Sequence, residues 1–196
     1  PDPLIATGVL SLPGTAMTLL LQVIWFLIPA GIANLIPPIS AKLFPHWSAP
    51  MDFGLRWRGQ QLFGSHETIR GLVTGTLMAM LTHQAQILLA RHYSALENLA
   101  VAPAFHQNWW LGAWLGLTAL LGDALKSLVK RQRHIEPGKP WLPWDKIDWI
   151  LGCLAGCWFL LPISPAFALT AIVCGLILSS AGRILGYWLK INDDWL

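Results

Sequence analysis

An aspartate pair spaced three residues apart, Asp145 and Asp148, lies in the segment PWLPWDKIDWILG. This spacing places both carboxylates on one face at the start of a helix. Paired carboxylates supply the hard oxygen ligands that suit Mg²⁺, which also keeps waters and takes substrate phosphate oxygens. The alternative is that Asp145 caps the helix and Asp148 lies in its first turn, where negative charge is favourable. The sequence alone leaves both interpretations open.

A third carboxylate, Asp123, lies near the end of the apolar run WWLGAWLGLTALLG. Helical spacing puts Asp123 on one face with Ser127 and Lys130, and Lys126 and Arg131 flank that face. An ionisable side chain inside a membrane span is costly and usually faces a cavity or a partner. We therefore interpret Asp123 as a site residue, with a simple ion pair to Lys126 or Lys130 as the alternative.

A basic segment, KRQRHIEPGKPW, connects Asp123 to the aspartate pair and contains Lys139. Ten charged residues fall between Gly122 and Asp148, in a chain with only 13 basic and 10 acidic residues. Lysine and arginine here are suited to neutralising a nucleotide triphosphate or a lipid phosphate. Such a polybasic loop on a membrane face can instead bind only anionic lipid head groups.

A second polar set lies upstream, in PMDFGLRWRGQQLFGSHETIRG, where glycines recur. Glycine-rich turns bring backbone N–H groups close to phosphates, although the spacing matches neither a Walker nor a Rossmann fingerprint. Asn34, at the polar end of the first apolar run, is placed to line the same cavity. The substrate-binding candidates outside the aspartate region are thus Asn34, Asp52, His66, Thr68 and Arg70.

The elements that position these residues are membrane helices. Hydrophobic residues make up 55% of the 196-residue chain, charged residues 12%, and the mean hydropathy is +0.52, whereas soluble domains carry about 25% charged residues. The apolar runs are continuous, which favours helices over a barrel. We predict an all-α integral membrane protein, a single domain over residues 1–196. Its five transmembrane helices are expected at about 16–36, 71–90, 109–129, 147–162 and 166–189, with cytoplasmic loops 37–70 and 130–146.

The distribution of basic residues predicts the orientation of these spans. With the N-terminus outside, every lysine and arginine except Arg91 falls on or near the inner side, including Arg183 and Lys190. This asymmetry indicates a cytoplasmic C-terminus in the cell membrane. Most acidic residues share that side, Asp2 and Glu97 being the exceptions. The basic residues flank apolar spans and form no stripe on a soluble domain, so we predict no nucleic-acid partner.

The order of these segments resembles the CDP-archaeol synthase family, a branch of the phosphatidate cytidylyltransferase superfamily. The resemblance covers most of the chain. It is carried by IPAGIAN, PMDFG, LFGSHETIRG, LGDALKSLVKR, PGKPWLPWDKIDWILG and the terminal GYWLKINDDW. It implies transfer of a CMP unit from CTP to a membrane lipid phosphate, giving a CDP-lipid and pyrophosphate with Mg²⁺, in phospholipid biosynthesis at the cytoplasmic face.

The superfamily signature carries over residue by residue. By resemblance, Asp123, Asp145 and Asp148 are catalytic residues that hold the metal, and Lys130 is catalytic. The same signature implies that Ser127 and Arg131 bind substrate. Lys126 and Lys139 are substrate-binding candidates because of the charge of their segment, beside those of the upstream set. The expected partners are CTP, a lipid phosphate of the archaetidic or phosphatidic acid type and the bilayer, with a homodimer left open.

The chain departs from the family pattern in the upstream loop. Glu67 stands where the family usually has a cation, and Ile69 where it has an aromatic residue. The alternative functions are therefore a non-catalytic or degenerate family member, and a small transporter or scaffold in which Asp123 is a coupling or pairing residue. Five spans without an obvious internal repeat speak against a transporter.

Overall fold

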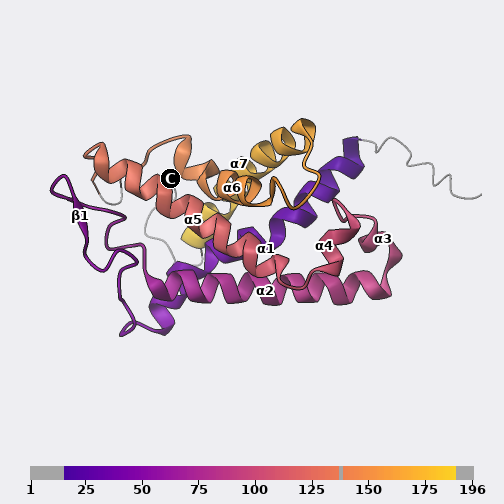
Figure 1. Cartoon of the computed structure of the whole chain (residues 1–196), viewed down its shortest axis with the longest axis horizontal. Coiled ribbons are helices and arrows are strands. Elements are labelled where there is room, and N and C mark those ends of the chain that lie inside the picture. The colour runs from indigo at the N-terminus through magenta and orange to yellow at the C-terminus, as the bar shows by residue number, and fades with distance from the viewer. Residues whose placement is uncertain (1–15, 137–138, 189–196) are drawn as a thin grey trace, which may run out of the picture.

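The computed structural model describes residues 16–136 and 139–188, which are mostly helical (Figure 1). Asp2, Lys190 and the end of the GYWLKINDDW segment lie outside the described residues, as does the side chain of Arg183. The elements, in chain order, are α1 (Ala16–Leu43), β1 (Arg56–Trp57), β2 (Gln60–Gln61), α2 (Ile69–His92), α3 (Ser94–Glu97), α4 (Pro103–Gln107), α5 (Leu111–Gln132), α6 (Trp144–Cys157) and α7 (Pro165–Trp188).

Helices α1, α2, α5, α6 and α7 occupy the positions of the expected spans. Three helical segments are long and apolar enough to cross a membrane: α1, α2 and Pro165–Gly182 of α7. Helix α5 carries several charges in its last turns, and α6 has only 14 residues. At 1.5 Å per residue α6 is about 21 Å long, less than the roughly 30 Å of a hydrocarbon core. The fold is that of a helical membrane protein with three candidate spans among the described residues, and five crossings stay a prediction.

The expected loop 37–70 is shorter than predicted, because α1 continues through Pro37 and Pro38 to Leu43. Proline keeps a helical φ, so its presence removes hydrogen bonds without requiring the helix to end. The remaining loop contains the antiparallel hairpin β1–β2, whose turn places Arg58 and Gly59 at positive φ. The second expected loop, 130–146, is shortened in the same way, since α5 ends at Gln132 and α6 begins at Trp144.

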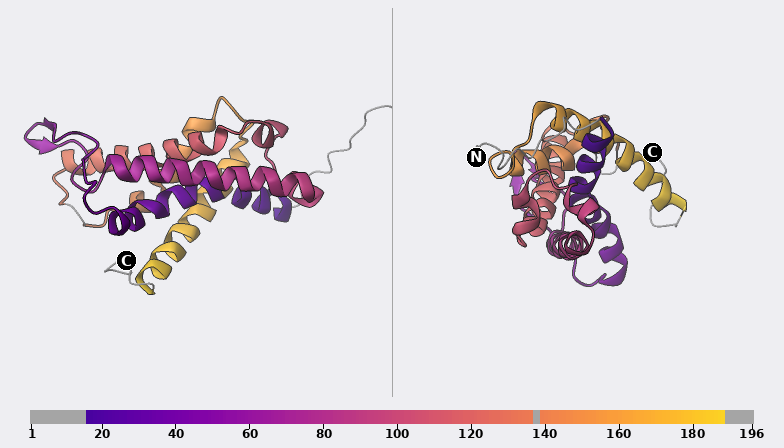
Figure 2. Two further views of the ribbon diagram at one scale, coloured as in Figure 1. Left: turned by 90° about the horizontal axis from the view of Figure 1, so that it is seen from below. Right: turned by 90° about the vertical axis from the view of Figure 1, so that its right-hand side faces the viewer.

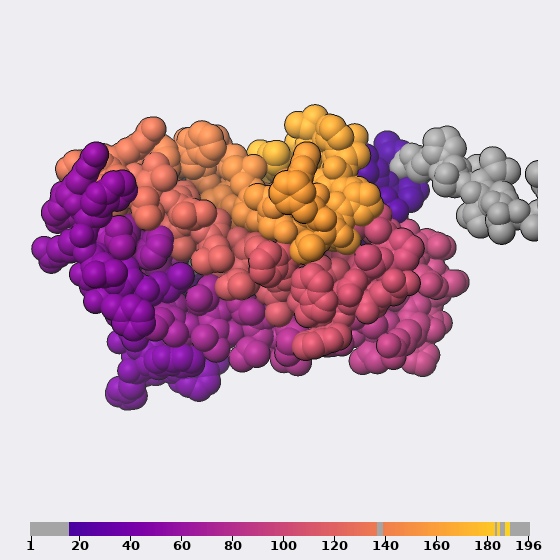
Figure 3. All heavy atoms as spheres, in the orientation of Figure 1, coloured from indigo at the N-terminus to yellow at the C-terminus, as the bar shows by residue number. Residues whose placement is uncertain are grey.

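The helices form an elongated bundle in which α5 lies between α2 and α6, and α1 contacts α2, α5 and α7 (Figures 1 and 2). The C-terminal end of α7 projects away from the other helices (Figure 2). In the space-filling view, α6 and the segment after it cover the upper side of α5 (Figure 3). The largest buried cluster unites α1, α5, α6 and α7 through side chains such as Phe26, Leu115, Ile150 and Phe167.

Helices α5 and α6 approach each other backbone to backbone. A Cβ atom added at Gly122 would lie 2.5 Å from the Asp148 carbonyl oxygen, and one at Gly152 would lie 2.3 Å from the Thr118 carbonyl oxygen. Real Cβ atoms do not approach backbone so closely, so the two glycines are what permit this spacing. The contact brings Asp123, next to Gly122, beside Asp148.

We expect Gly152→Ala to lower the free energy of unfolding by about 1–3 kcal/mol, because the added methyl group has backbone against it and must push α6 away. The matched control is Gly31→Ala, whose Cβ would meet the Trp149 ring at an ordinary 3.8 Å. Thermal unfolding of the purified variants in detergent measures the difference. Equal stability of the two variants would contradict the close α5–α6 contact.

Candidate active site

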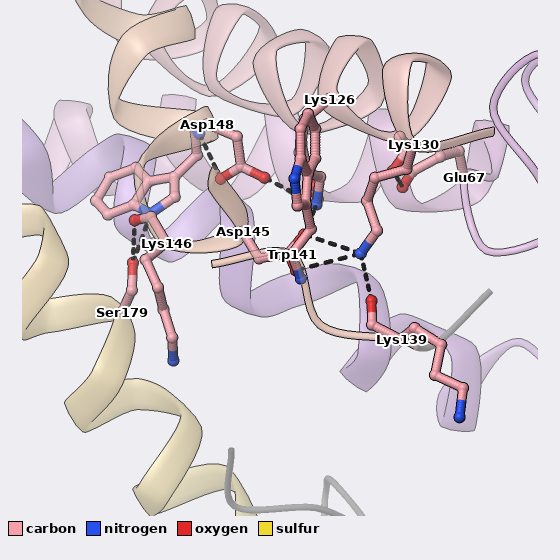
Figure 4. A network of polar contacts seen from close by, with 12 residues as sticks. Glu67, Lys126, Lys130, Lys139, Trp141, Asp145, Lys146, Asp148 and Ser179 are labelled. Carbon is pink, nitrogen blue, oxygen red and sulfur yellow. Dashed lines mark hydrogen bonds and ion pairs between the residues drawn. The ribbon is translucent and has the colours of Figure 1, made fainter. Parts of the chain in front are cut away.

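Three predicted metal-site carboxylates converge on one ammonium group. The Lys126 Nζ atom lies 2.6 Å from Asp123 Oδ1, 2.9 Å from Asp148 Oδ2 and 3.2 Å from Asp145 Oδ1. Lys126 and Asp123 come from one helix turn of α5, while Asp145 and Asp148 come from the first turns of α6 (Figure 4). All four side chains are largely buried. The i,i+3 spacing of the aspartate pair therefore does place both carboxylates toward one cluster.

A second ammonium group, that of Lys130, also contacts Asp145. The Lys130 Nζ atom lies 3.0 Å and 3.2 Å from the two carboxylate oxygens of Asp145, and it donates to the Lys139 carbonyl oxygen at 2.6 Å. The backbone N–H of Trp141 also donates to Asp145. Asp145 is thus bonded to both the end of α5 and the connecting segment, and this fixes the 139–145 segment over the cluster.

A cavity of about 630 Å³ adjoins this cluster, and its lining combines polar and apolar side chains. Its lining includes seven of the predicted site residues: Asn34, Asp123, Lys126, Lys130, Lys139, Asp145 and Asp148. Helices α1 and α7 contribute apolar side chains, with Ile28, Ile32, Leu35 and Leu178 among them. A ligand with a charged head and an apolar chain matches both kinds of lining.

The wall formed by α7 is attached to α6 through a polar contact that no sequence pattern predicts. The indole Nε1 of Trp149 donates to Ser179 Oγ at 2.8 Å, and Ser179 Oγ donates to the Lys146 carbonyl oxygen at 2.9 Å (Figure 4). A serine within an apolar span and a tryptophan beside Asp148 were the available signals. The spacing between α6 and α7 could not be read from them.

Glu67 is a fourth carboxylate at the cluster and was absent from the predicted site residues. It extends from the loop before α2, and its Oε1 accepts a hydrogen bond from Ser127 Oγ at 2.9 Å. Burial, and next the Asp123 carboxylate, raise the pKa of the Glu67 carboxyl to about 7. Its departure from the family pattern was the one signal in the sequence. Ser127 is thereby placed beside the cluster with its hydroxyl already bonded.

The remaining predicted residues do not line this cavity in the described part of the chain. Thr68 caps α2, its Oγ1 accepting from the Gly71 N–H, and Arg70 donates to the Phe44 carbonyl oxygen at 2.8 Å. Arg131 is buried and donates to the Ile135 carbonyl oxygen. His66 is exposed. These contacts are structural, and a role for these side chains in binding substrate stays a prediction.

The Asp52 side chain is likewise held by hydrogen bonds within its own loop. Its two carboxylate oxygens accept backbone N–H groups, from Gly54 at 2.9 Å and from Phe63 at 3.0 Å. Burial alone would raise the pKa of the Asp52 carboxyl, but these hydrogen bonds outweigh it and hold the pKa below its ordinary value. The ionised Asp52 therefore stabilises the fold of the loop that carries Glu67.

The carboxylates at the cluster are chemically suited to bind a magnesium ion. Three carboxylates offer hard oxygen atoms around one point, from two rigid helices, which is how proteins hold this ion. As they stand, the carboxylates surround the Lys126 ammonium, and no group of three or more metal-type side chains in the described residues has the geometry of a metal site. A metal would therefore take oxygens that now contact Lys126.

Known proteins are similar to this chain over most of its length. A family model described as CDP-archaeol synthase (CarS-like) matches residues 16–196. A CDP-archaeol synthase of Methanocaldococcus jannaschii is 30% identical over 178 residues, covering 90% of this chain and 97% of that protein. One of Thermofilum pendens is 33% identical, covering 84% of this chain and 77% of that protein. A solved structure of an intramembrane enzyme for archaeal membrane lipids biosynthesis has a TM-score of 0.63 at 31% identity, covering 84% of this chain and 94% of that one.

We expect Asp52→Ala to lower the free energy of unfolding at pH 7 by about 1–3 kcal/mol, because two backbone N–H groups lose a charged acceptor. The lowered pKa sets the sign of the pH dependence. The stabilisation is present above the unfolded pKa of about 3.9 and is lost as pH falls through the folded pKa. Unfolding of wild type and variant from pH 7 to pH 3 should therefore show the difference shrinking below about pH 4. A constant difference across this range would contradict the ionised state of Asp52.

Proposed function

The chain belongs to the CDP-archaeol synthase family, and we propose on that premise that its polar cavity transfers the CMP unit of CTP to a membrane lipid phosphate. The products are a CDP-lipid and pyrophosphate. The observation that carries the proposal is the cavity itself, whose lining combines lysines and carboxylates with apolar side chains of α1 and α7. A soluble nucleotide and a lipid acceptor can share such a cavity.

The reaction requires little covalent chemistry from the protein. An oxygen of the lipid phosphate attacks the α-phosphorus of CTP, a new P–O bond forms, and the bond to the bridging oxygen breaks so that pyrophosphate leaves. The protein's contribution to such a transfer is positioning and the neutralisation of phosphate charge. Lys126, Lys130 and Lys139 line the cavity and are the groups we assign to phosphates.

Asp123, Asp145 and Asp148 are the residues we assign to Mg²⁺, which would supply positive charge that neutralises the phosphates. The fit rests on the convergence of the three carboxylates. Asn34, at the cavity wall contributed by α1, is assigned to the substrate. The upstream loop acts in this proposal through Glu67, which accepts a hydrogen bond from Ser127 of α5 beside the carboxylates.

We also propose the membrane orientation. Residues 1–196 form one membrane-embedded domain that crosses the cell membrane five times, with the N-terminus outside and the site at the cytoplasmic face. The support is the asymmetry of lysine and arginine, with Arg91 alone on the outer side. A nucleotide made in the cytoplasm then reaches the cavity directly. No contact in the described residues favours a homodimer, and family membership does not favour a transporter or scaffold.

The function is tested by incubating the purified protein in detergent with labelled CTP, Mg²⁺ and a panel of lipid phosphates. The panel contrasts ether-linked isoprenoid with ester-linked acyl acceptors, since an apolar wall accepts either. We expect a labelled CDP-lipid with at least one acceptor and none without lipid. Absence of product with every acceptor, together with absence of CTP binding, would overturn the proposal.

We expect Asp148→Asn to reduce turnover by about 10²–10³-fold, as for the loss of one preorganised electrostatic group. Asparagine keeps the acceptor for the Trp149 N–H, which Asp148 now bonds at 2.8 Å, so the fold should survive. Glu97→Gln is the matched control, because Glu97 is exposed on α3, at the other end of the bundle (Figure 1). Near-normal activity of Asp148→Asn would return the aspartate pair to a capping role.

A further inference from the structure

The N–H donors of the Lys126 ammonium group already face carboxylates, so none is left for a substrate. An ammonium group carries three N–H bonds, and Lys126 has one carboxylate for each of them: Asp123, Asp145 and Asp148. Lys130, by contrast, contacts Asp145 alone of the three and a backbone carbonyl. A phosphate that enters the cavity therefore finds Lys126 already bonded, although this side chain lines the wall.

The position of this ammonium is also the position that a divalent cation would require. The oxygens that surround Lys126 belong to the three carboxylates assigned to metal, on the two helices held together at Gly122 and Gly152. A double charge at the same point interacts about twice as strongly with each carboxylate as the single charge of Lys126. Both cations cannot occupy one point, so they compete.

We propose that Lys126 is a placeholder cation: it neutralises the three carboxylates before substrate arrives, leaves them when a divalent cation binds, and then donates to a nucleotide phosphate in the cavity. This inference rests on the proposed function. It makes Lys126 a positioning residue whose availability depends on metal.

The geometry supplies what such a movement needs. Lysine has a flexible four-carbon stem, so its ammonium can swing while the helix stays fixed. The cavity of about 630 Å³ lies directly beside it, and gives the released group a polar region in which to point. Because coupling between two ligands is reciprocal, metal should tighten nucleotide binding and nucleotide should tighten metal binding to the same degree.

The movement is tested in the unaltered protein by labelling lysines with an amine-reactive reagent and quantifying each site by mass spectrometry. Without metal, Lys126 should be protected; Mg²⁺ alone, with no nucleotide, should raise its labelling several-fold. Lys42, which is exposed on α1, serves as the reference for reagent reactivity. Labelling of Lys126 that stays unchanged or falls at Mg²⁺ concentrations supporting turnover would overturn the proposal.

The competition is tested by titrating Mn²⁺ into nucleotide-free protein and following the free ion by electron paramagnetic resonance. Lys126→Met should bind Mn²⁺ about tenfold more tightly than wild type, within the usual range of coupling between two ligands. Lys130→Met removes the same charge from a side chain that contacts Asp145 alone of the three, and should change the affinity by less. Equal effects of the two substitutions, or weaker binding by Lys126→Met, would show that general electrostatics and not displacement is responsible.

These outcomes separate the inference from the function on which it rests. If the wild-type protein makes CDP-lipid but shows no Mg²⁺-dependent labelling of Lys126, the proposed function stands and the placeholder role of Lys126 is wrong. If the protein makes no CDP-lipid, the proposed function itself is wrong, whatever the labelling shows. The labelling measurement needs no substitution, so a misfolded variant cannot obscure the result.

Discussion

The structure depends on the compensation of charge inside an apolar bundle. An uncompensated carboxylate costs several kcal/mol when it is removed from water, so Asp123, Asp145 and Asp148 can be buried together only around a cation. Lys126 is that cation, and its contacts join α5 to α6. The same contacts concentrate negative charge in the lining of the cavity. The carboxylates whose ion pairs stabilise the fold therefore also surround a position suited to a cation.

The close approach of α5 and α6 makes this arrangement possible. Glycine at Gly122 and Gly152 lets the two backbones touch, and the touching turns are those next to the aspartates. Had larger residues separated the helices, carboxylates from α5 and α6 could not reach one ammonium group. Two glycines without functional side chains thus control the spacing of the aspartates. The Trp149–Ser179 contact extends this control to α7 and so to the apolar wall.

The sequence predicted the helices and the gathering of charge well, because both follow from local patterns. Apolar runs located the helices, and i,i+3 spacing set the aspartate pair toward one cluster. The ion pair between Asp123 and Lys126, which the sequence offered as the alternative to a site role, is present. Contacts between distant segments could not be predicted in the same way. Nothing local indicates that Asp52 accepts from the Phe63 N–H, or that Arg70 donates to the Phe44 carbonyl oxygen instead of facing a ligand. The predicted end of the first span, at about residue 36, falls short of the end of α1 at Leu43 because the helix continues through Pro37 and Pro38.

Glu67 shows why the charge balance of the whole cluster matters for the nucleotide. With Glu67 there are four carboxylates around the ammonium groups of Lys126 and Lys130. Burial, and next the Asp123 carboxylate, raise the pKa of Glu67 to about 7. A triphosphate that approached these carboxylates by itself would be repelled by their negative charge. In the proposed reaction, a divalent cation that accompanies the phosphates would offset the carboxylates and make binding of the triphosphate favourable. On that proposal, the Glu67 carboxylate would increase the dependence of nucleotide binding on metal and would not by itself remove the site.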